Sequence, residues 1–150
     1  MGGFTREKRF RTRSVAGTLA LGETLAEMLR PLPRLVVLRG EVGAGKTTLV
    51  KGIAAAIGAA AQEEVTSPTF TLVHEYEGKG VRLFHLDLYR LETEEQIAVL
   101  GIEEMASEPD ALVIVEWGER FQSIADAAEA EIAMGPGEAE NERLLLVRWR

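Results

Sequence analysis

Residues 40–48, GEVGAGKTT, combine three glycines with one lysine and two adjacent hydroxyl side chains. They match the pattern G-x-x-x-x-G-K-[ST], with Gly40, Gly45, Lys46 and Thr47 at its fixed positions. Glycine permits positive φ angles and lets an oxyanion approach the backbone amides without interference from a Cβ atom. In this pattern Lys46 would reach the β- and γ-phosphates of a nucleotide, and the Thr47 hydroxyl would ligate Mg²⁺. The sequence therefore predicts a phosphate-binding loop rather than a glycine-rich turn with an incidental lysine.

The segments on either side of this loop support the prediction. Residues 35–38 form a short apolar run that is typical of a buried strand, and residues 48–57 have the apolar pattern of a helix. A helix that begins at the loop would add the partial positive charge of its N-terminus to the site. The expected strand, loop and helix together suit an anionic ligand.

Two acidic residues follow apolar stretches, Asp87 in FHLDLYR and Glu116 in ALVIVEWGER. Ligands of α/β proteins bind at the carboxyl ends of the strands, so either carboxylate could hold Mg²⁺, directly or through water. The alternative is an acid that only marks where a strand emerges into solvent. The purely apolar strand before Glu116 favours a metal role there more strongly than at Asp87, where LDLYR alternates as in an amphipathic strand.

The other candidate nucleotide contacts each allow two interpretations. In VTSPTFTLVHEY, the hydroxyls of Thr66, Ser67 and Thr69 surround Pro68, which suits either a loop that senses the γ-phosphate or an ordinary turn before a strand. Trp117, next to the acidic residue that ends its strand, could stack near the nucleotide or be a half-buried core aromatic.

The histidines and two of the arginines are expected to have structural duties. His74 and His85 each lie on a predicted strand without a second ligand at metal spacing, so we expect them to be structural. Arg90 and Arg120 are candidates for neutralising phosphate charge, but surface ion pairing is the duty we expect for both.

Composition limits the class of protein. A chain of 150 residues has the size of one domain, and its apolar share of 46% is ordinary for a globular protein. With no cysteines, disulfides and cysteine-ligated metals are excluded. The net charge of −7 argues against a generally basic surface that coats nucleic acid. The longest nearly apolar stretch, residues 53–61, is too short to span a bilayer, and no signal peptide is recognisable, so we expect a cytoplasmic protein without a membrane partner.

The elements predicted around these residues form one α/β domain over residues 14–150, with a P-loop NTPase-like mixed β-sheet and helices on both faces. The basic segment 1–13 is expected to be a solvated or frayed terminus rather than a contact for RNA or a partner. Beyond the elements already named, we predict helices over 14–30 and 93–105, and strands over 70–76, 81–88, 111–115, 130–134 and 144–149. The strands 70–76 and 81–88 are expected to form a hairpin, and Thr93 with Gln96 is a candidate capping box at the start of its helix.

Five segments in order resemble the TsaE (YjeE) family of small bacterial ATPases: GEVGAGKTTLVKGIAAAIG, VTSPTFTLVHEY, FHLDLYRL, LGIEE and LVIVEWGER. The resemblance covers residues 35 to about 120, and the helix 14–30 is also similar to the family's opening helix. It implies a P-loop ATPase that supports formation of N6-threonylcarbamoyl-adenosine beside the anticodon of certain tRNAs. It also implies action on the TsaD–TsaB complex, with tRNA contacted indirectly through that complex.

The resemblance implies a role for each matching residue, with ATP or ADP and Mg²⁺ as ligands. Lys46, Asp87 and Glu116 would carry the catalytic functions, and Thr47 and Glu116 would ligate the metal. The nucleotide would be bound by Gly43, Ala44, Gly45, Lys46, Thr47, Thr48, Thr66, Ser67, Thr69 and Trp117.

Other functions for a phosphate-binding loop are also considered. A small nucleotide or metabolite kinase usually has an arginine-rich lid, and no such run occurs between residues 90 and 120. A GTPase is disfavoured because the chain has no N-K-x-D sequence. A binding module that nucleotide occupancy switches, without significant turnover, would need the same binding residues and stays open.

Overall fold

The computed structural model describes residues 3–41, 44–69 and 71–150. Within them the strands form one sheet in the order β1-β7-β6-β2-β5-β4-β3. The strands are β1 (Arg6–Thr12), β2 (Arg34–Arg39), β3 (Val73–Gly78), β4 (Val81–Asp87), β5 (Ala111–Glu116), β6 (Ala130–Pro136) and β7 (Arg143–Trp149). The helices are α1 (Val15–Met28), α2 (Lys46–Ile57), α3 (Glu94–Leu100), α4 (Ile102–Ser107) and α5 (Gln122–Ala127), with 3₁₀ turns η1 (Gln62–Glu64) and η2 (Gly118–Arg120).

The sheet is parallel at its centre and antiparallel at both sides. Strand β2 pairs in parallel with β5 and β6, and β5 pairs in parallel with β4. The outer pairs β1–β7, β6–β7 and β3–β4 are antiparallel. This arrangement confirms the predicted mixed sheet, including the hairpin around Gly80.

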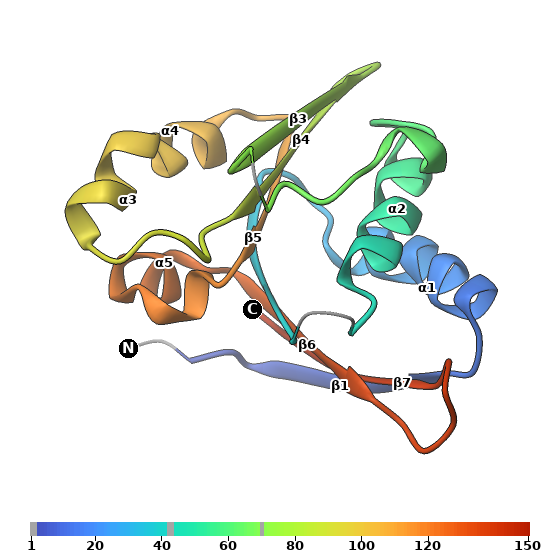
Figure 1. The fold of residues 1–150 in the computed structure, drawn as a ribbon. Coiled ribbons are helices and arrows are strands. Elements are labelled where there is room, and N and C mark those ends of the chain that lie inside the picture. The colour runs from blue at the N-terminus through green and yellow to red at the C-terminus, as the bar shows by residue number, and fades with distance from the viewer. Residues whose placement is uncertain (1–2, 42–43, 70) are drawn as a thin grey trace.

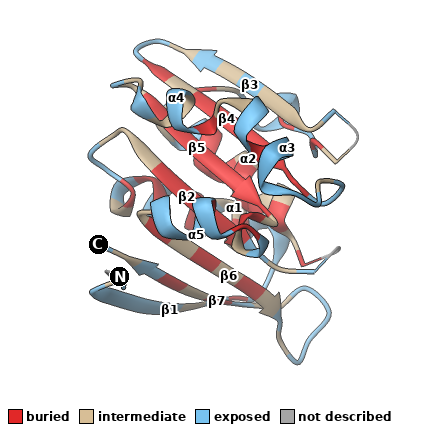
Figure 2. Ribbon diagram, turned by 90° about the vertical axis from the view of Figure 1, so that its left-hand side faces the viewer, coloured by how far each residue is buried: buried red, intermediate tan, exposed pale blue. Residues whose placement is uncertain are grey.

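Helices cover both faces of the central strands (Figure 1). One core lies under α1 and α2 and includes Leu112 and Ile114 of β5, while the other lies under α3, α4 and α5 and includes Val113 and Val115. Successive residues of a strand point to opposite faces, so the continuous apolar run of β5 serves both cores. Figure 2 shows that buried residues concentrate in these central strands, whereas β1 is largely exposed.

The N-terminal segment differs from its prediction. Residues Arg6–Thr12 form an edge strand paired with β7 along its whole length, so the expected frayed terminus is wrong, although most of the side chains are exposed. Phe10 packs against the core, and the buried hydroxyls of Thr12 and Thr18 lie 2.7 Å apart. Lysine and arginine on an edge strand discourage pairing with other chains, which gives the basic composition a structural reason.

Two other elements differ from the sequence prediction. The helix expected over 93–105 divides at Gly101, whose φ of +72° ends α3 and precedes α4. The start of α3 agrees with expectation, since Thr93 and Gln96 form the predicted capping box. The short helix α5 was not predicted. No helix among the described residues has the length and apolar character needed to cross a membrane.

Candidate nucleotide-binding site

A cavity of about 590 Å³ opens at the carboxyl ends of β4 and β5, beside the start of α2. It brings together nine of the residues predicted from sequence, and Tyr89 and Arg143 complete its lining. The nine are Gly45, Lys46, Thr47, Thr48, Ser67, Thr69, Asp87, Glu116 and Trp117. Ala44 and Thr66 lie outside this lining, and Gly43 falls outside the described residues.

A second cavity, of about 640 Å³, lies over β1, β6 and β7. It is lined by apolar side chains and by Arg9 and Arg11, and none of the residues predicted to act on a ligand borders it. Although it is slightly larger, it contains no carboxylate or hydroxyl side chain that could serve a nucleotide–metal complex. The smaller cavity is therefore the candidate site.

The turn before α2 can be formed only by glycine at two positions. Gly45 has a φ of +96°, and a Cβ atom there would lie 3.1 Å from Met134 Cε and 3.4 Å from Arg143 Nε. A Cβ atom on Gly40 would lie 2.7 Å from the Met134 carbonyl oxygen. Because Gly45 is the N-cap of α2, no side chain competes for the first amides of the helix. Those amides suit an oxyanion.

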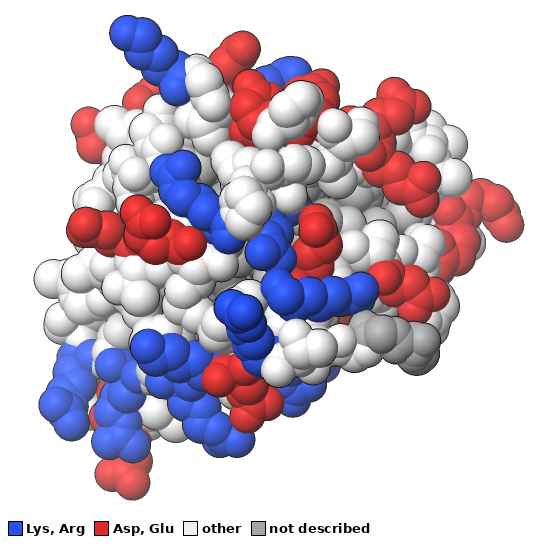
Figure 3. Space-filling view, turned by 180° about the vertical axis from the view of Figure 1, so that it is seen from behind, with Lys and Arg blue, Asp and Glu red and all other residues white. Residues whose placement is uncertain are grey.

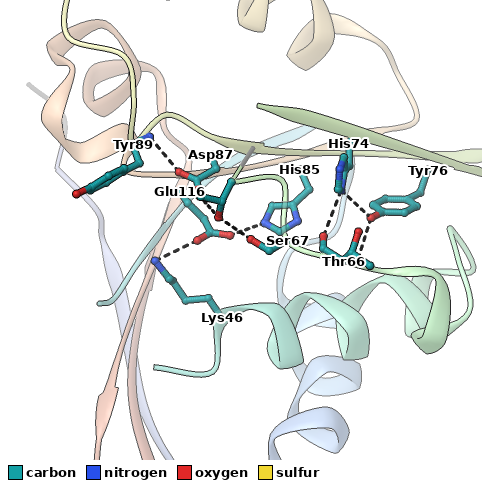
Figure 4. Close-up of polar contacts among 10 residues, drawn as sticks. Lys46, Thr66, Ser67, His74, Tyr76, His85, Asp87, Tyr89 and Glu116 are labelled. Atoms are coloured by element: carbon teal, nitrogen blue, oxygen red, sulfur yellow. Dashed lines mark hydrogen bonds and ion pairs between the residues drawn. The ribbon is translucent and has the colours of Figure 1, made fainter. Parts of the chain in front are cut away.

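Lys46, Glu116 and His85 form a buried chain of polar contacts beside the cavity (Figure 4). Lys46 Nζ lies 3.0 Å from Glu116 Oε1, and His85 Nε2 lies 2.6 Å from Glu116 Oε2. Burial by itself raises the pKa of Glu116, but the hydrogen bond from His85 and the nearby Lys46 ammonium outweigh it, so the pKa is lowered below its usual value. The carboxylate is thus held ionised between two nitrogen donors.

Asp87 connects the cavity to the loop that carries Ser67 and Thr69. The Thr69 hydroxyl donates to Asp87 Oδ2 at 3.0 Å, and the Tyr89 amide donates to Asp87 Oδ1 at 2.9 Å. The hydroxyls of Ser67 and Thr69 lie 2.8 Å apart. Asp87 is 5% exposed, so the interpretation of a strand-end acid in solvent does not hold for it. It does not hold for Glu116 either, which is 4% exposed.

A second set of contacts holds the same loop against β3. The Thr66 amide donates to the Tyr76 hydroxyl at 3.2 Å, and His74 Nδ1 lies 3.2 Å from the Thr66 carbonyl oxygen. His74 Nε2 lies 2.6 Å from the Thr71 hydroxyl. His74 is therefore structural in the sense expected, since its ring contacts loop residues, and Thr66 anchors the loop rather than lining the cavity.

Trp117 occupies a strained position beside the cavity. Its φ of +66° is unusual for a bulky residue. Its ring centre lies 5.4 Å from Lys46 Nζ and 5.3 Å from the Tyr89 ring centre. Arg120 stacks on the same ring at 5.2 Å and donates to the carbonyl oxygens of residues 88, 89 and 91. Arg120 thus binds carbonyl oxygens of the segment that follows β4, instead of forming the expected surface ion pair. Arg90 is exposed and lies outside the cavity lining.

Sequence reasoning missed Arg143 and Tyr89. Arg143 Nε donates to the Ala44 carbonyl oxygen at 2.8 Å, across 99 positions of sequence. No local pattern marks such a long-range contact. Tyr89 could have been found, because it lies two residues after Asp87 in the DLYR motif.

A strand that leads through a glycine turn of this pattern into a helix is the supersecondary unit of P-loop NTPases, and this chain has that fold. A crystal structure of YdiB from Bacillus subtilis has the same fold, with a TM-score of 0.72 at 24% identity. The match covers 99% of this chain and 88% of YdiB.

Sequence comparison identifies the family. The model for threonylcarbamoyl adenosine biosynthesis protein TsaE matches residues 12–145. The tRNA threonylcarbamoyladenosine biosynthesis protein TsaE of Haemophilus influenzae is 40% identical over 115 residues, which cover 74% of this chain and 71% of that protein. The protein of the same name from Treponema pallidum is 42% identical over 112 residues, covering 75% and 79%. The chain therefore belongs to the TsaE family.

Proposed function

We propose that this protein binds and hydrolyses ATP with Mg²⁺, and that it thereby supports threonylcarbamoyl-adenosine modification of tRNA by acting on a TsaD–TsaB complex. The observation that carries the nucleotide part is the 3.0 Å contact between Lys46 Nζ and Glu116 Oε1 in the cavity beside the glycine turn. This contact brings together the lysine proposed to bind phosphate and the carboxylate proposed to bind the metal. The tRNA pathway is supported by membership of the TsaE family and by the names of its relatives. The TsaD–TsaB partnership is what the resemblance of the sequence segments to that family implies.

The donor set of the cavity suits Mg²⁺. Thr47 offers a hydroxyl and Glu116 a carboxylate, which are oxygen ligands of the kind that Mg²⁺ prefers. Among the described residues, no group of three His, Cys, Asp or Glu side chains could form a cage for a metal. Mg²⁺ commonly takes its remaining ligands from phosphate and water, so a hydroxyl and one carboxylate are enough.

The chain's own groups have separate duties in this proposal. With nucleotide bound, Lys46 would exchange its contact with Glu116 for one with the β- and γ-phosphates, and the freed Oε1 of Glu116 would be available to hold the metal. The first amides of α2 would hold the phosphate oxygens, and Asp87 with Thr69 would position groups at the opposite wall of the cavity. Bound Mg²⁺ neutralises the charge that develops on the phosphates during transfer.

The same geometry supports the proposal that partners control hydrolysis. Asp87 connects the cavity to a loop that Tyr76 and His74 fasten to β3. Phosphoryl transfer depends mainly on positioning and charge neutralisation, so hydrolysis should be slow until a partner orders this loop. A nucleotide-switched binding module without turnover would use the same contacts.

Single-turnover hydrolysis of ATP, with and without TsaD–TsaB, tests the proposal. We expect slow hydrolysis by the isolated protein and a faster rate in the complex. Equal rates would reject partner control. Binding of TsaD–TsaB that depends on ATP, with no hydrolysis in either sample, would instead establish the switched module, and transfer of phosphate to a small metabolite would indicate a kinase.

A further inference from the structure

His85 is the most deeply buried polar residue of the site, with a side chain that is 0% exposed. It lies on β4, on the face that packs under α2, and reaches across to the end of β5. Its ring nitrogen Nε2 lies 2.6 Å from Glu116 Oε2. Burying an imidazole against a carboxylate costs desolvation of both groups, so a position of this kind invites a functional explanation.

The geometry settles which ring nitrogen carries the proton. An ionised carboxylate only accepts hydrogen bonds, so the nitrogen at 2.6 Å from Glu116 must be the donor. Within the part of the chain that the structure describes, Nδ1 has no hydrogen-bond partner. A proton on Nδ1 would therefore be a buried donor without an acceptor, and the Nε2–H form of His85 fits the site better.

We propose that His85 is a positioning residue that fixes the Glu116 carboxylate so that Oε1 is presented to the metal. This inference rests on the proposed function and assigns a duty to a residue that does not line the cavity.

The two contacts of Glu116 are unequal in a way that supports this duty. Lys46 lies at the start of α2 and lines the cavity, so a nucleotide can draw its ammonium away from Oε1. His85 lies on a strand that is hydrogen-bonded to β5 along its length, with Asp87 opposite Glu116 in the register. When Lys46 leaves, the hydrogen bond to Oε2 remains and still fixes the plane of the carboxylate.

Substitution of His85 should therefore weaken metal binding more than it weakens nucleotide binding in the absence of metal. The coupling to measure is the ratio of ADP affinity in Mg²⁺ to ADP affinity in EDTA, obtained by calorimetry. Loss of an outer hydrogen bond to a ligating carboxylate typically reduces metal affinity about 10- to 100-fold. We expect His85→Leu to reduce the coupling by about tenfold or more, because Oε2 then lacks a donor.

Two further variants separate positioning from general damage to the core. His85→Gln can place an amide N–H close to the Nε2 position and should keep most of the coupling. Leu83→Val alters a fully buried neighbour on the same face of β4 without reaching Glu116, and should leave the coupling within about twofold of the wild type. If His85→Leu does not fold, the His85→Gln variant decides the question. Loss of the coupling in His85→Gln, with the coupling retained in Leu83→Val, would then count against the inference.

The ring of the wild-type protein supplies a readout that needs no mutation. Two-bond ¹⁵N correlation NMR should show His85 protonated on Nε2, without ligand and with Mg²⁺·ADP. A proton on Nδ1, or unchanged coupling in a folded His85→Leu protein, would overturn the inference while leaving the nucleotide proposal intact. Wild-type protein that binds ADP neither with Mg²⁺ nor in EDTA would overturn the proposed function itself.

Discussion

Asp87 and Glu116 are direct partners in the register of the parallel strands β4 and β5. Each carboxylate reaches a different segment beside the cavity, since Asp87 accepts from Thr69 and Glu116 contacts Lys46. Two neighbouring strand ends thus connect the start of α2 to the loop before β3. The two segments are therefore separated by the width of a single strand pair.

The proposed contact of Lys46 with the phosphates predicts a large effect of its substitution on nucleotide binding. Lys46→Ala removes a charge-assisted contact worth about 1.5–3 kcal/mol, so nucleotide affinity should fall roughly 10- to 100-fold by calorimetry. Lys51→Ala is the matched control, because Lys51 lies on the same helix and its ammonium donates to the Gln62 carbonyl oxygen instead. Unchanged affinity in a folded Lys46→Ala protein would reject the assigned role.

The hydrogen bond from the Thr69 hydroxyl is expected to stabilise its loop locally rather than the whole fold. Thr69→Val keeps the shape of the side chain but removes the donor to Asp87 Oδ2, a hydrogen bond to a charged group in a part-buried position. Losing about 1.5 kcal/mol locally should speed hydrogen exchange of the loop amides about tenfold, as measured by mass spectrometry. The amide of Leu72, which donates to the Pro68 carbonyl oxygen at 2.7 Å, is a suitable reporter.

Thr71→Val is the control for this measurement, because it removes a hydroxyl from the same loop that contacts His74 rather than Asp87. Its effect should be confined to the β3 side of the loop. If both variants exchange as the wild type does, the hydroxyl contacts do not hold the loop.

The lowered pKa of Glu116 predicts how stability depends on pH. Because the folded-state pKa lies below the ordinary value of 4.5, the unfolded chain takes up a proton at this group more readily. The stabilisation from Glu116 is therefore complete above that ordinary value and is lost as the pH falls through the folded-state pKa. Melting temperatures of the wild type and Glu116→Gln, measured from about pH 7 down to about pH 3, should converge on acidification. A difference that is constant over this range would contradict the ionised buried carboxylate.

The parts of this structure that the sequence predicted are those set by local pattern. The glycine turn, the capping box at Thr93 and the two strand-end acids are defined within a few residues, and the structure places them as expected. Gly101 was misjudged because a single glycine can be tolerated inside a helix, whereas here its positive φ ends one.

The features missed by sequence depend on distant segments. Strand β1 forms by pairing with β7 at the other end of the chain, whereas its basic composition alone suggests a solvated terminus. Figure 3 shows Lys and Arg side chains gathered along the lower edge of the molecule, at the level of β1 in Figure 1. Arg143 reaches Ala44 only once β7 has been added to the sheet. The orientation of His85 toward Glu116 likewise depends on the pairing of β4 with β5.

The approach of α1 to α2 gives a prediction in which two effects have opposite signs. Alanine normally stabilises a helix interior by about 0.5–1 kcal/mol relative to glycine. At Gly52, however, a Cβ atom would lie 2.3 Å from the Leu19 carbonyl oxygen, and backbone atoms cannot move aside without separating the helices. Overpacking of this kind costs about 1–3 kcal/mol, so Gly52→Ala should lower the free energy of unfolding by about 1–2 kcal/mol in urea titrations.

Ala56→Gly calibrates the propensity term on the same helix, because Ala56 is exposed and its substitution should cost only about 0.5–1 kcal/mol. One substitution replaces glycine by alanine and the other replaces alanine by glycine, yet both are expected to lower the free energy of unfolding. Helix propensity alone would give the two substitutions opposite signs. A stabilised Gly52→Ala protein would mean that α1 withdraws from α2 without cost. The close contact at Gly52 would then have no part in seating the helix that begins at Lys46.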